Sequence, residues 1–224
     1  MADYQSVALR DPSSSLSATY VPVAGMVCTS LADDGVELLG QRRGLQTYVT
    51  SGKTMGIPIL YPWANRLSAS KYGINGGVVT LTPGVAGVRT DEHGVPIHGV
   101  LAANPGWLVI EQSENRLVAV LDWGGKPGLL STFPFPHILT MTVTLADRTL
   151  TVEAVRAIGL ALGSLARARG IDRAVVGRDG RLSGPALAGA LAEGFRDAGV
   201  SVMDIGQVTT PVVYYATYEL RTGT

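Results

Sequence analysis

The sequence predicts an α+β chain in two parts, with antiparallel strands first and a small β-α-β unit after them. Up to Leu150, apolar and polar residues alternate in short runs interrupted by Gly, Pro and Asn, which is typical of half-buried antiparallel strands. Beyond Glu153, apolar residues such as Val155, Ile158 and Leu162 recur at helical spacing, and a short apolar strand, a Gly-rich turn and another helix follow. This change of period divides the chain into a polar lead-in at 1–16, a β-rich part at 17–152 and an α/β part at 153–224.

The composition narrows the class of protein. Hydrophobic residues make up 46% of the 224 residues, which is enough for a core. A net charge of zero and a pI near 6.8 argue against nucleic acid or an anionic membrane as a partner. The single cysteine, Cys28, precludes an internal disulfide and a cysteine-based metal cluster, so we expect it in the core of a protein from a reducing compartment. The sequence shows no signal peptide and no apolar run of about 18 residues, so we expect a cytoplasmic protein. We also expect no cofactor and no metal.

The β-rich part consists of short strands joined by recognisable turns. Asp33-Asp34-Gly35 is a tight-turn sequence and Asn75-Gly76-Gly77 is a hairpin sequence. The run Phe-Pro-Phe-Pro-His at 133–137 is a stiff connector, and Gly-Gly-Lys-Pro at 124–127 is a turn. The expected strands cover residues 18–23, 26–31, 36–39, the hairpin within 72–81, 107–111, 117–123 and 138–145.

Two loops in this part are rich in polar groups. Residues 56–67, Gly-Ile-Pro-Ile-Leu-Tyr-Pro-Trp-Ala-Asn-Arg-Leu, are too rigid, and too polar at their end, for a core strand. Residues 91–99, Asp-Glu-His-Gly-Val-Pro-Ile-His-Gly, form the second loop. We expect the first loop to belong to a functional site.

These motifs, followed by a Trp strand and by Phe-Pro-Phe before a strand that ends in Leu, resemble the N-terminal half of an aldose 1-epimerase, or galactose mutarotase-like, domain. The resemblance covers roughly residues 17–153. It implies a partial antiparallel β-supersandwich that binds a free aldose and interconverts its α and β anomers. It also implies that Arg66, in the Asn-Arg motif, and His98, in the His-Gly motif, contact the sugar hydroxyls and the ring oxygen.

The chemistry of mutarotation suits these residue types. One group must protonate the ring oxygen while another takes the proton from the C1 hydroxyl, and histidine is the residue type most often suited to be the acid, which makes His98 the candidate. Arg66, with the neighbouring Asn65, can hold hydroxyls, and Trp63 can stack on a sugar face. The family's base is a carboxylate and a second His lies beside the sugar, but no segment after Leu150 matches the part of the domain that carries them.

A structural role stays open for several of these side chains. A lone His in a loop is more often a hydrogen-bonded structural residue than an acid, so His98 remains open between the two roles. Core packing is the better interpretation of Trp107, on an alternating strand. We expect His93 and His137 to be structural or solvent-exposed.

The α/β part is predicted as three helices and two parallel strands. Its elements are helices at 153–169, 186–198 and 212–220 and strands at 174–176 and 200–205. Gly170 ends the first helix, Ser183 is the expected cap of the second with Pro185 in its first turn, and Thr209 is the expected cap of the third.

The run Gly-Arg-Asp-Gly-Arg-Leu-Ser-Gly-Pro at 177–185, then Asp-Ile-Gly and Thr-Thr-Pro-x-x-Tyr-Tyr-Ala, resembles the first domain of the phosphoglucomutase/phosphomannomutase family. That family moves a phosphoryl group between C1 and C6 of a hexose, and its phosphoserine loop is expected just beyond residue 224. Arg178 and Arg181 beside a helix start suit a phosphate, with Ser183 nearby. The alternative, which we prefer, is an Asp179–Arg181 network that shapes the turn, with Ser183 acting as a cap.

Three classes of function follow from the two resemblances. The first is a mutarotase-type isomerase that uses His98 and Arg66, the second a phosphohexomutase-derived fragment that binds a sugar phosphate, and the third a non-catalytic chimera. We favour the third class, without catalysis, as the present state of the chain. We favour the first class as the ancestry of its larger part. The expected partner is a small sugar or sugar phosphate, with no nucleic acid or membrane, and open sheet edges favour self-association.

Overall fold

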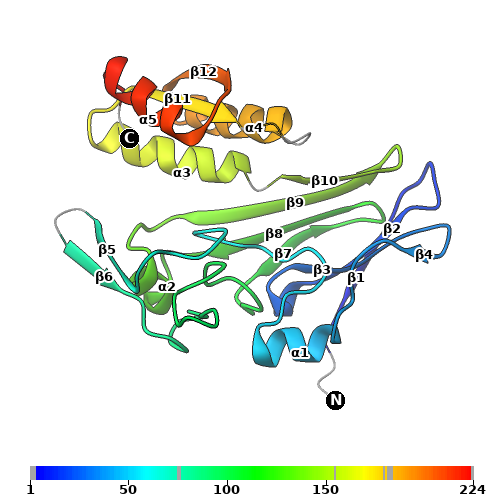
Figure 1. Cartoon of the computed structure of the whole chain (residues 1–224). Coiled ribbons are helices and arrows are strands. Elements are labelled where there is room, and N and C mark those ends of the chain that lie inside the picture. The colour runs from blue at the N-terminus through cyan, green and yellow to red at the C-terminus, as the bar shows by residue number, and fades with distance from the viewer. Residues whose placement is uncertain (1–3, 75–76, 154, 179, 181–183, 223–224) are drawn as a thin grey trace. The chain divides into compact units, whose positions relative to one another are not determined.

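The computed structural model describes residues 4–74, 77–153, 155–178, 180 and 184–222. It is mixed α and β, with antiparallel sheets in its larger part (Figure 1). The chain divides into two compact units. The first comprises Met1–Ile138 and Thr142–Val152, and the second Leu139–Met141 and Glu153–Thr224.

The first sheet of unit 1 is an antiparallel meander in the order β1-β2-β3-β4. Its strands are β1 (Val7–Arg10), β2 (Ser17–Val21), β3 (Val27–Asp33) and β4 (Val36–Glu37). The predicted turn between β3 and β4 is confirmed, because Asp34 and Gly35 both take positive φ, at 49° and 77°. Strand β1 lies inside the segment expected to be a polar lead-in. Val7 and Leu9 are buried and alternate with exposed residues, so this short stretch pairs with β2.

The second antiparallel sheet has the order β10-β9-β8-β7 and belongs to unit 1 except for Leu139–Met141 of β9 and Glu153 of β10. Its strands are β7 (Leu108–Gln112), β8 (Arg116–Asp122), β9 (Ile138–Ala146) and β10 (Thr149–Glu153). Alternation predicted β7 to β9 well: in β9 every second residue from Leu139 to Leu145 is buried. The residues from 149 to 153, where the period of the sequence changes, form β10.

Smaller elements complete unit 1. A 3-10 helix, η1 (Pro22–Ala24), follows β2, and β5 (Lys71–Ile74) pairs with β6 (Gly77–Thr80) as the hairpin that was predicted, with residues 75–76 outside the described ranges. Two helices, α1 (Gly44–Ser51) and α2 (Pro127–Thr132), were not predicted. Helix α1 is held by Tyr48, which is fully buried in a cluster with Val21, Ala24, Val27 and Met55. Cys28 is buried and free, as expected.

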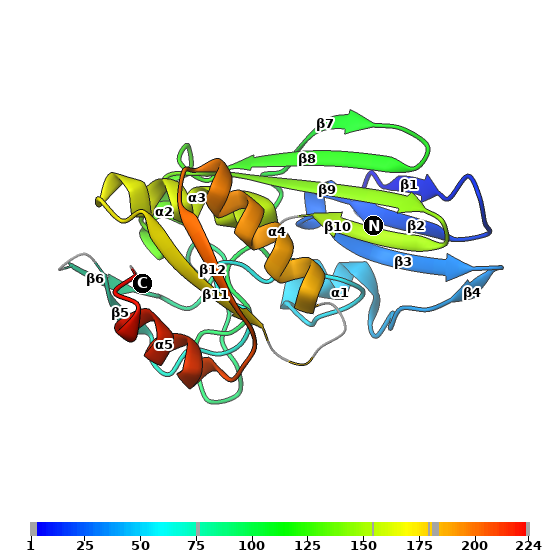
Figure 2. The same ribbon diagram turned by 90° about the horizontal axis from the view of Figure 1, so that it is seen from above.

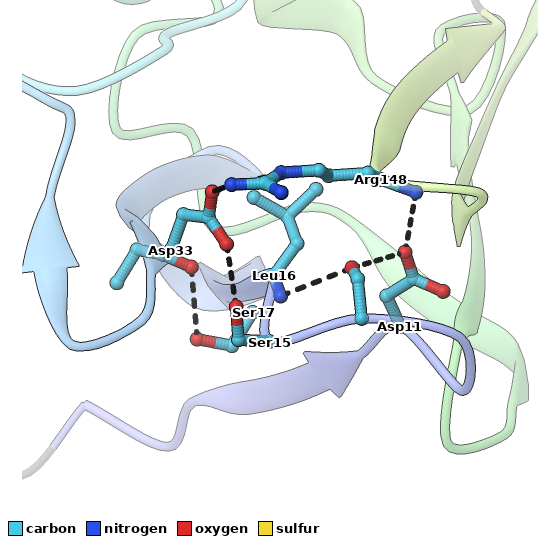
Figure 3. A network of polar contacts seen from close by, with 8 residues as sticks. Asp11, Ser15, Leu16, Ser17, Asp33 and Arg148 are labelled. Carbon is cyan, nitrogen blue, oxygen red and sulfur yellow. Dashed lines mark hydrogen bonds and ion pairs between the residues drawn. The ribbon is translucent and has the colours of Figure 1, made fainter.

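A polar network joins the first sheet to the turn between β9 and β10 (Figure 3). The carboxylate of Asp11 is buried and accepts hydrogen bonds from the Ser13 backbone, from the Ser13 and Ser14 hydroxyls and from the backbone N–H of Arg148. The Arg148 guanidinium in turn forms an ion pair with Asp33, which also accepts a hydrogen bond from Ser15. Residues more than a hundred positions apart are therefore fixed together.

Unit 2 contains α3 (Val155–Ala168), β11 (Arg173–Arg178), α4 (Gly184–Asp197), β12 (Ser201–Gln207) and α5 (Thr210–Glu219). β11 and β12 pair in parallel, which confirms the β-α-β prediction, and α4 and α5 both contact β11 (Figure 2). Gly170, at φ 75°, follows the end of α3 as predicted. Thr209 occupies the N-cap position of α5, but its side chain makes no capping hydrogen bond. The predicted cap Ser183, together with Asp179 and Arg181, lies outside the described residues. Among the helices that the structure describes, none is long and apolar enough to cross a membrane.

Candidate functional site

The two polar loops of unit 1 pair with each other through their backbones. The N–H of Leu67 donates to the carbonyl of Pro96 at 2.8 Å, and the N–H of His98 donates to the carbonyl of Asn65 at 3.1 Å. An antiparallel bridge between Arg66 and Ile97 lies between these bonds. The structure thus brings Asn65, Arg66 and His98 onto adjacent segments, although His98 follows Arg66 by 32 positions and Asn65 by 33.

Two further contacts fix the register of the pairing. The N–H of Val100 donates to the carbonyl of Tyr61 at 2.8 Å. Gly99 takes φ 67°, and a Cβ at this position would lie 2.1 Å from the Tyr61 carbonyl oxygen. Only glycine fits this approach of one backbone to the other, which explains the Gly of the His-Gly motif.

Arg66 is held by a carboxylate that the sequence did not single out. Its Nε donates to Asp91 Oδ2 at 2.8 Å, and the Asp91 side chain is only 3% exposed while that of Arg66 is 51% exposed. Asp91 Oδ1 also accepts the backbone N–H groups of His93 and Val95. Burial acts to raise the pKa of Asp91, but the hydrogen bonds from Val95, His93 and Arg66 outweigh it and lower the pKa below the ordinary value.

The ring of His98 has a defined orientation. Nδ1 lies 2.9 Å from the carbonyl oxygen of Ala64, and because a carbonyl can only accept, Nδ1 carries the proton. In the neutral ring Nε2 is therefore an acceptor, and it becomes a donor when the ring is protonated. No hydrogen bond among the described residues occupies Nε2, so it is the ring nitrogen open to a ligand.

Tyr61, from the first loop, packs in a cluster of aromatic side chains. Tyr61 contacts Trp123, Phe133 and His137 edge-on, and its hydroxyl lies 3.0 Å from His137 Nε2. Since His137 Nδ1 donates to the Phe135 carbonyl, Nε2 accepts from Tyr61, and this His is built into the packing as expected.

The remaining Trp and His residues named from the sequence lie outside this aromatic cluster. Trp63 is half-buried, and its indole N–H is buried without a hydrogen-bond partner. Trp107 is buried, in line with core packing. His93 is exposed and lies 3.7 Å from the Glu92 carboxylate. Among the described residues, no group of three or more His, Cys, Asp or Glu side chains could hold a metal ion.

Unit 2 has a cavity of about 540 Å³ at the ends of its parallel strands. Gly177 and Arg178 at the end of β11, Gln207 at the end of β12 and Thr209 just before α5 line it. The Arg178 guanidinium reaches Asp204 at 3.2 Å, a partner that sequence reasoning also missed. The other two predicted phosphate ligands, Arg181 and Ser183, lie outside the described residues.

The model of the family described as aldose 1-epimerase matches residues 11–157, which is more than half of the chain. The chain belongs to the aldose 1-epimerase family. A second model, described as phosphoglucomutase/phosphomannomutase alpha/beta/alpha domain I, matches residues 143–224. This aldose 1-epimerase family member is therefore a two-part chimera, and the two matches overlap in β9, β10 and the first residues of α3.

Phosphoglucomutase-type relatives match the second part of the chimera. A phosphoglucomutase of Neisseria meningitidis serogroup B is 46% identical over 72 residues, which are 32% of this chain and 16% of that protein. A phosphomannomutase/phosphoglucomutase of Pseudomonas aeruginosa is 54% identical over 68 residues, 30% of this chain and 15% of that one. The chain thus spans about a sixth of the length of these relatives.

Solved structures match the larger part. A protein of Synechocystis sp. PCC 6803 superposes with a TM-score of 0.53 at 24% identity, over 67% of this chain and 47% of that one. A galactose mutarotase-like protein of Clostridium acetobutylicum gives a TM-score of 0.53 at 16% identity, over 66% of this chain and 44% of that one. At these identities the likeness concerns the fold.

Proposed function

We propose that unit 1 binds a free aldose at the paired loops 61–67 and 96–99. Arg66 and Asn65 contact the sugar hydroxyls, Trp63 packs on a sugar face, and His98 protonates the ring oxygen through Nε2. The observation that supports the proposal is the backbone hydrogen bond from the His98 N–H to the Asn65 carbonyl, because it holds the segments that contain these residues side by side. We further propose that residues 17–152 form a partial β-supersandwich and that residues 153–224 form the phosphohexomutase-derived part.

Turnover requires a base as well as an acid. Asp91 is the carboxylate in direct contact with these loops, but it already accepts three hydrogen bonds and its pKa is lowered. A carboxylate stabilised in this way takes up a proton poorly, so it serves better to orient Arg66 than to deprotonate the C1 hydroxyl. We therefore propose that unit 1 binds aldoses but interconverts their anomers slowly.

Binding and turnover are tested separately. Saturation-transfer NMR with glucose and galactose measures binding, and polarimetry on freshly dissolved α-anomers measures mutarotation. The informative variant is His98→Asn, because Asn tolerates the positive φ of 63° at this position and cannot protonate the sugar. His93→Asn, at an exposed His outside the pairing, is the matched control.

We expect binding in the parent and in both variants. Any mutarotation above the buffer rate should persist in His93→Asn and fall by roughly 100-fold in His98→Asn, since general acids contribute about that much. Absence of aldose binding by the parent would remove the proposal. Mutarotation by His98→Asn at the parental rate would remove His98 as the acid.

The cavity at Arg178 favours a second candidate function, binding of phosphate or a sugar phosphate by unit 2. Ligands bind at the carboxyl ends of parallel strands, and a helix start there offers free backbone N–H groups to an anion. Calorimetry with glucose 1-phosphate tests it, with Arg178→Gln as the variant and the exposed Arg173→Gln, at the other end of β11, as the control. The candidate is contradicted if the parent shows no heat of binding, or if the heat measured with Arg178→Gln equals that of the parent.

We also propose self-association through the edge strand β7. The strand lies at the end of its sheet and exposes Leu108 and Ile110, at 64% and 58%. Sedimentation should show a concentration-dependent dimer in the parent that Ile110→Lys abolishes. If the chain stays monomeric at all concentrations, this proposal is wrong. The third class, a non-catalytic chimera that associates, then has no support.

A further inference from the structure

We propose that Arg89 and Lys126 form a binding site for a small oxyanion, a phosphate group by preference, in a cavity beside α1. The cavity has a volume of about 400 Å³ and belongs to unit 1. It lies between Val49 of α1, the turn at Ala86 and Gly87, the segment that follows Gly99, and the start of α2. Neither Arg66 nor His98 lines it, so the site is independent of the proposed aldose site.

The first observation is a buried donor without an acceptor. The Nη1 atom of Arg89 is buried and has no hydrogen-bond partner. A buried guanidinium N–H left unpaired destabilises the fold, and arginine does not escape this cost by losing its proton. The Arg89 guanidinium lies 5.8 Å over the ring of Tyr48, a contact that offsets only part of this cost.

The Arg89 side chain is also held in place. A Cβ on Gly52, just after α1, would lie 2.7 Å from Arg89 Cδ and 2.8 Å from Nη1, so the side chain packs directly on that backbone. The Arg89 carbonyl accepts the N–H of Ile97, which anchors its own backbone. Arg89 is half-buried and lines the cavity, and a guanidinium fixed in this way loses little conformational entropy when it binds an anion.

The second observation is a second cation in the same cavity. Lys126 precedes α2 and lines the cavity, and its Nζ lies close to Gly106, where a Cβ would meet it at 2.9 Å. Among the ion pairs of the described residues, none includes Arg89 or Lys126, and no Asp or Glu lines the cavity. Two positive charges therefore line one concave surface without a protein counter-charge.

The chemistry of the lining defines the ligand. A guanidinium fork and an ammonium together match the oxygens of a phosphate group, and the forked donors of arginine favour phosphate or carboxylate over a spherical anion. The remaining surface is largely apolar, from side chains such as Val49, Val100 and Leu129, so a compact organic group attached to the phosphate also fits.

The test uses the whole chain and thermal unfolding followed by tryptophan fluorescence. All three tryptophans lie in unit 1, so the signal reports on the unit that holds the cavity. Orthophosphate, methyl phosphate and acetate are each compared with chloride at equal ionic strength. Because a ligand that binds only the folded chain raises Tm, orthophosphate at about ten times its Kd should raise Tm by about 2–5 °C over chloride.

Three variants make the result specific. Arg89→Met and Lys126→Met should each reduce the phosphate-dependent rise in Tm at least about fivefold, whereas Lys71→Met, at an exposed lysine of β5, should keep it. In chloride alone, Arg89→Met should be at least as stable as the parent, since a methionine of similar length removes the unpaired cation. A role of Arg89 in packing alone predicts the opposite result, a variant that is less stable than the parent in chloride.

The outcomes separate the possibilities. A response to both phosphates but not to acetate assigns the site to phosphate groups. An equal response to acetate supports an oxyanion site and overturns the preference for phosphate. A Tm in phosphate equal to that in chloride, or a phosphate response that Arg89→Met retains, overturns the proposal. Neither result bears on aldose binding, which the NMR experiment measures separately.

Discussion

The carboxylate of Asp11 accepts a hydrogen bond from the backbone N–H of Arg148 at 2.5 Å, although 137 positions separate the two residues. Arg148 lies in the tight turn between β9 and β10, where both Asp147 and Arg148 take positive φ. The contact therefore connects the segment between β1 and β2 to the far end of the second sheet (Figure 3). This hydrogen bond links the two four-stranded sheets of unit 1.

The first prediction concerns acid stability at Asp11. Hydrogen bonds from the Ser14 hydroxyl and the Ser13 backbone, with further bonds from Arg148 and the Ser13 hydroxyl, outweigh burial and place the pKa of Asp11 well below its ordinary value. A carboxyl group with a lowered pKa stabilises the fold above its unfolded pKa of roughly 3.9, and this contribution is lost as the pH falls below that value. We expect Asp11→Asn to lower the free energy of unfolding at pH 7 and the deficit to shrink as the pH falls below about 4.

Urea unfolding of unit 1, followed by tryptophan fluorescence at several pH values, measures this deficit. Asp34→Asn is the control, since Asp34 is exposed in a turn whose positive φ suits Asn. An Asp11→Asn deficit that stays constant between pH 7 and the acid limit would show that the charge of Asp11 contributes nothing.

The second prediction isolates the close approach at Gly99. Gly94 and Gly99 both take positive φ, at 78° and 67°, but a Cβ on Gly94 meets nothing within 4 Å. Gly94→Ala should therefore cost only the backbone strain of an L-residue, about 1–2 kcal/mol. Gly99→Ala should cost about 1–3 kcal/mol more, because its methyl group collides with the Tyr61 backbone. Equal losses for the two variants would show that the paired loops separate without cost.

Most helices and strands could be predicted from the sequence, whereas contacts between distant residues could not. Strands such as β9, and helices such as α3 and α4, follow from the period of their own residues, so they were predicted. Helix α1 was not, because it contains Thr and Val and is stabilised by burying Tyr48 in a core formed from distant residues.

The candidate site divides in the same way. Arg66 and His98 could be named from their motifs, and the stiff loops around them indicated a site. The partner Asp91 could not be assigned, since its contact with Arg66 depends on how two loops 25 positions apart cross. The buried Nη1 of Arg89 is likewise a product of packing, and no local pattern in the sequence signals it.

The third prediction concerns the protonation of His137. Burial in the aromatic cluster lowers the pKa of His137, although the hydrogen bond to the Phe135 carbonyl acts in the opposite direction. The unfolded chain therefore binds a proton more readily, and the stability that the neutral ring contributes is lost as the pH falls below about 6.5. NMR titration should place the His137 pKa below 6.5.

The Tyr61→Phe variant tests the cause of this shift. It removes the hydroxyl that donates to Nε2 and keeps the ring contacts with Trp123, so the neutral imidazole loses one stabilising bond. We expect the pKa of His137 to rise in this variant. An unchanged pKa would assign the shift to burial alone.

The fourth prediction tests how α3 and α4 pack in unit 2. Gly159 of α3 is buried, and a Cβ there would lie 2.2 Å from the carbonyl oxygen of Leu191 in α4, whereas a Cβ on Gly189 of α4 meets nothing within 4 Å. Gly189→Ala should stabilise unit 2 by roughly 0.5–1 kcal/mol, because alanine is the better helix former. Gly159→Ala gains the same propensity but forces the helices apart, so we expect a net loss of about 1–3 kcal/mol. Far-UV circular dichroism during urea unfolding measures both, and a Gly159→Ala variant as stable as Gly189→Ala would mean that the helices do not approach at Gly159.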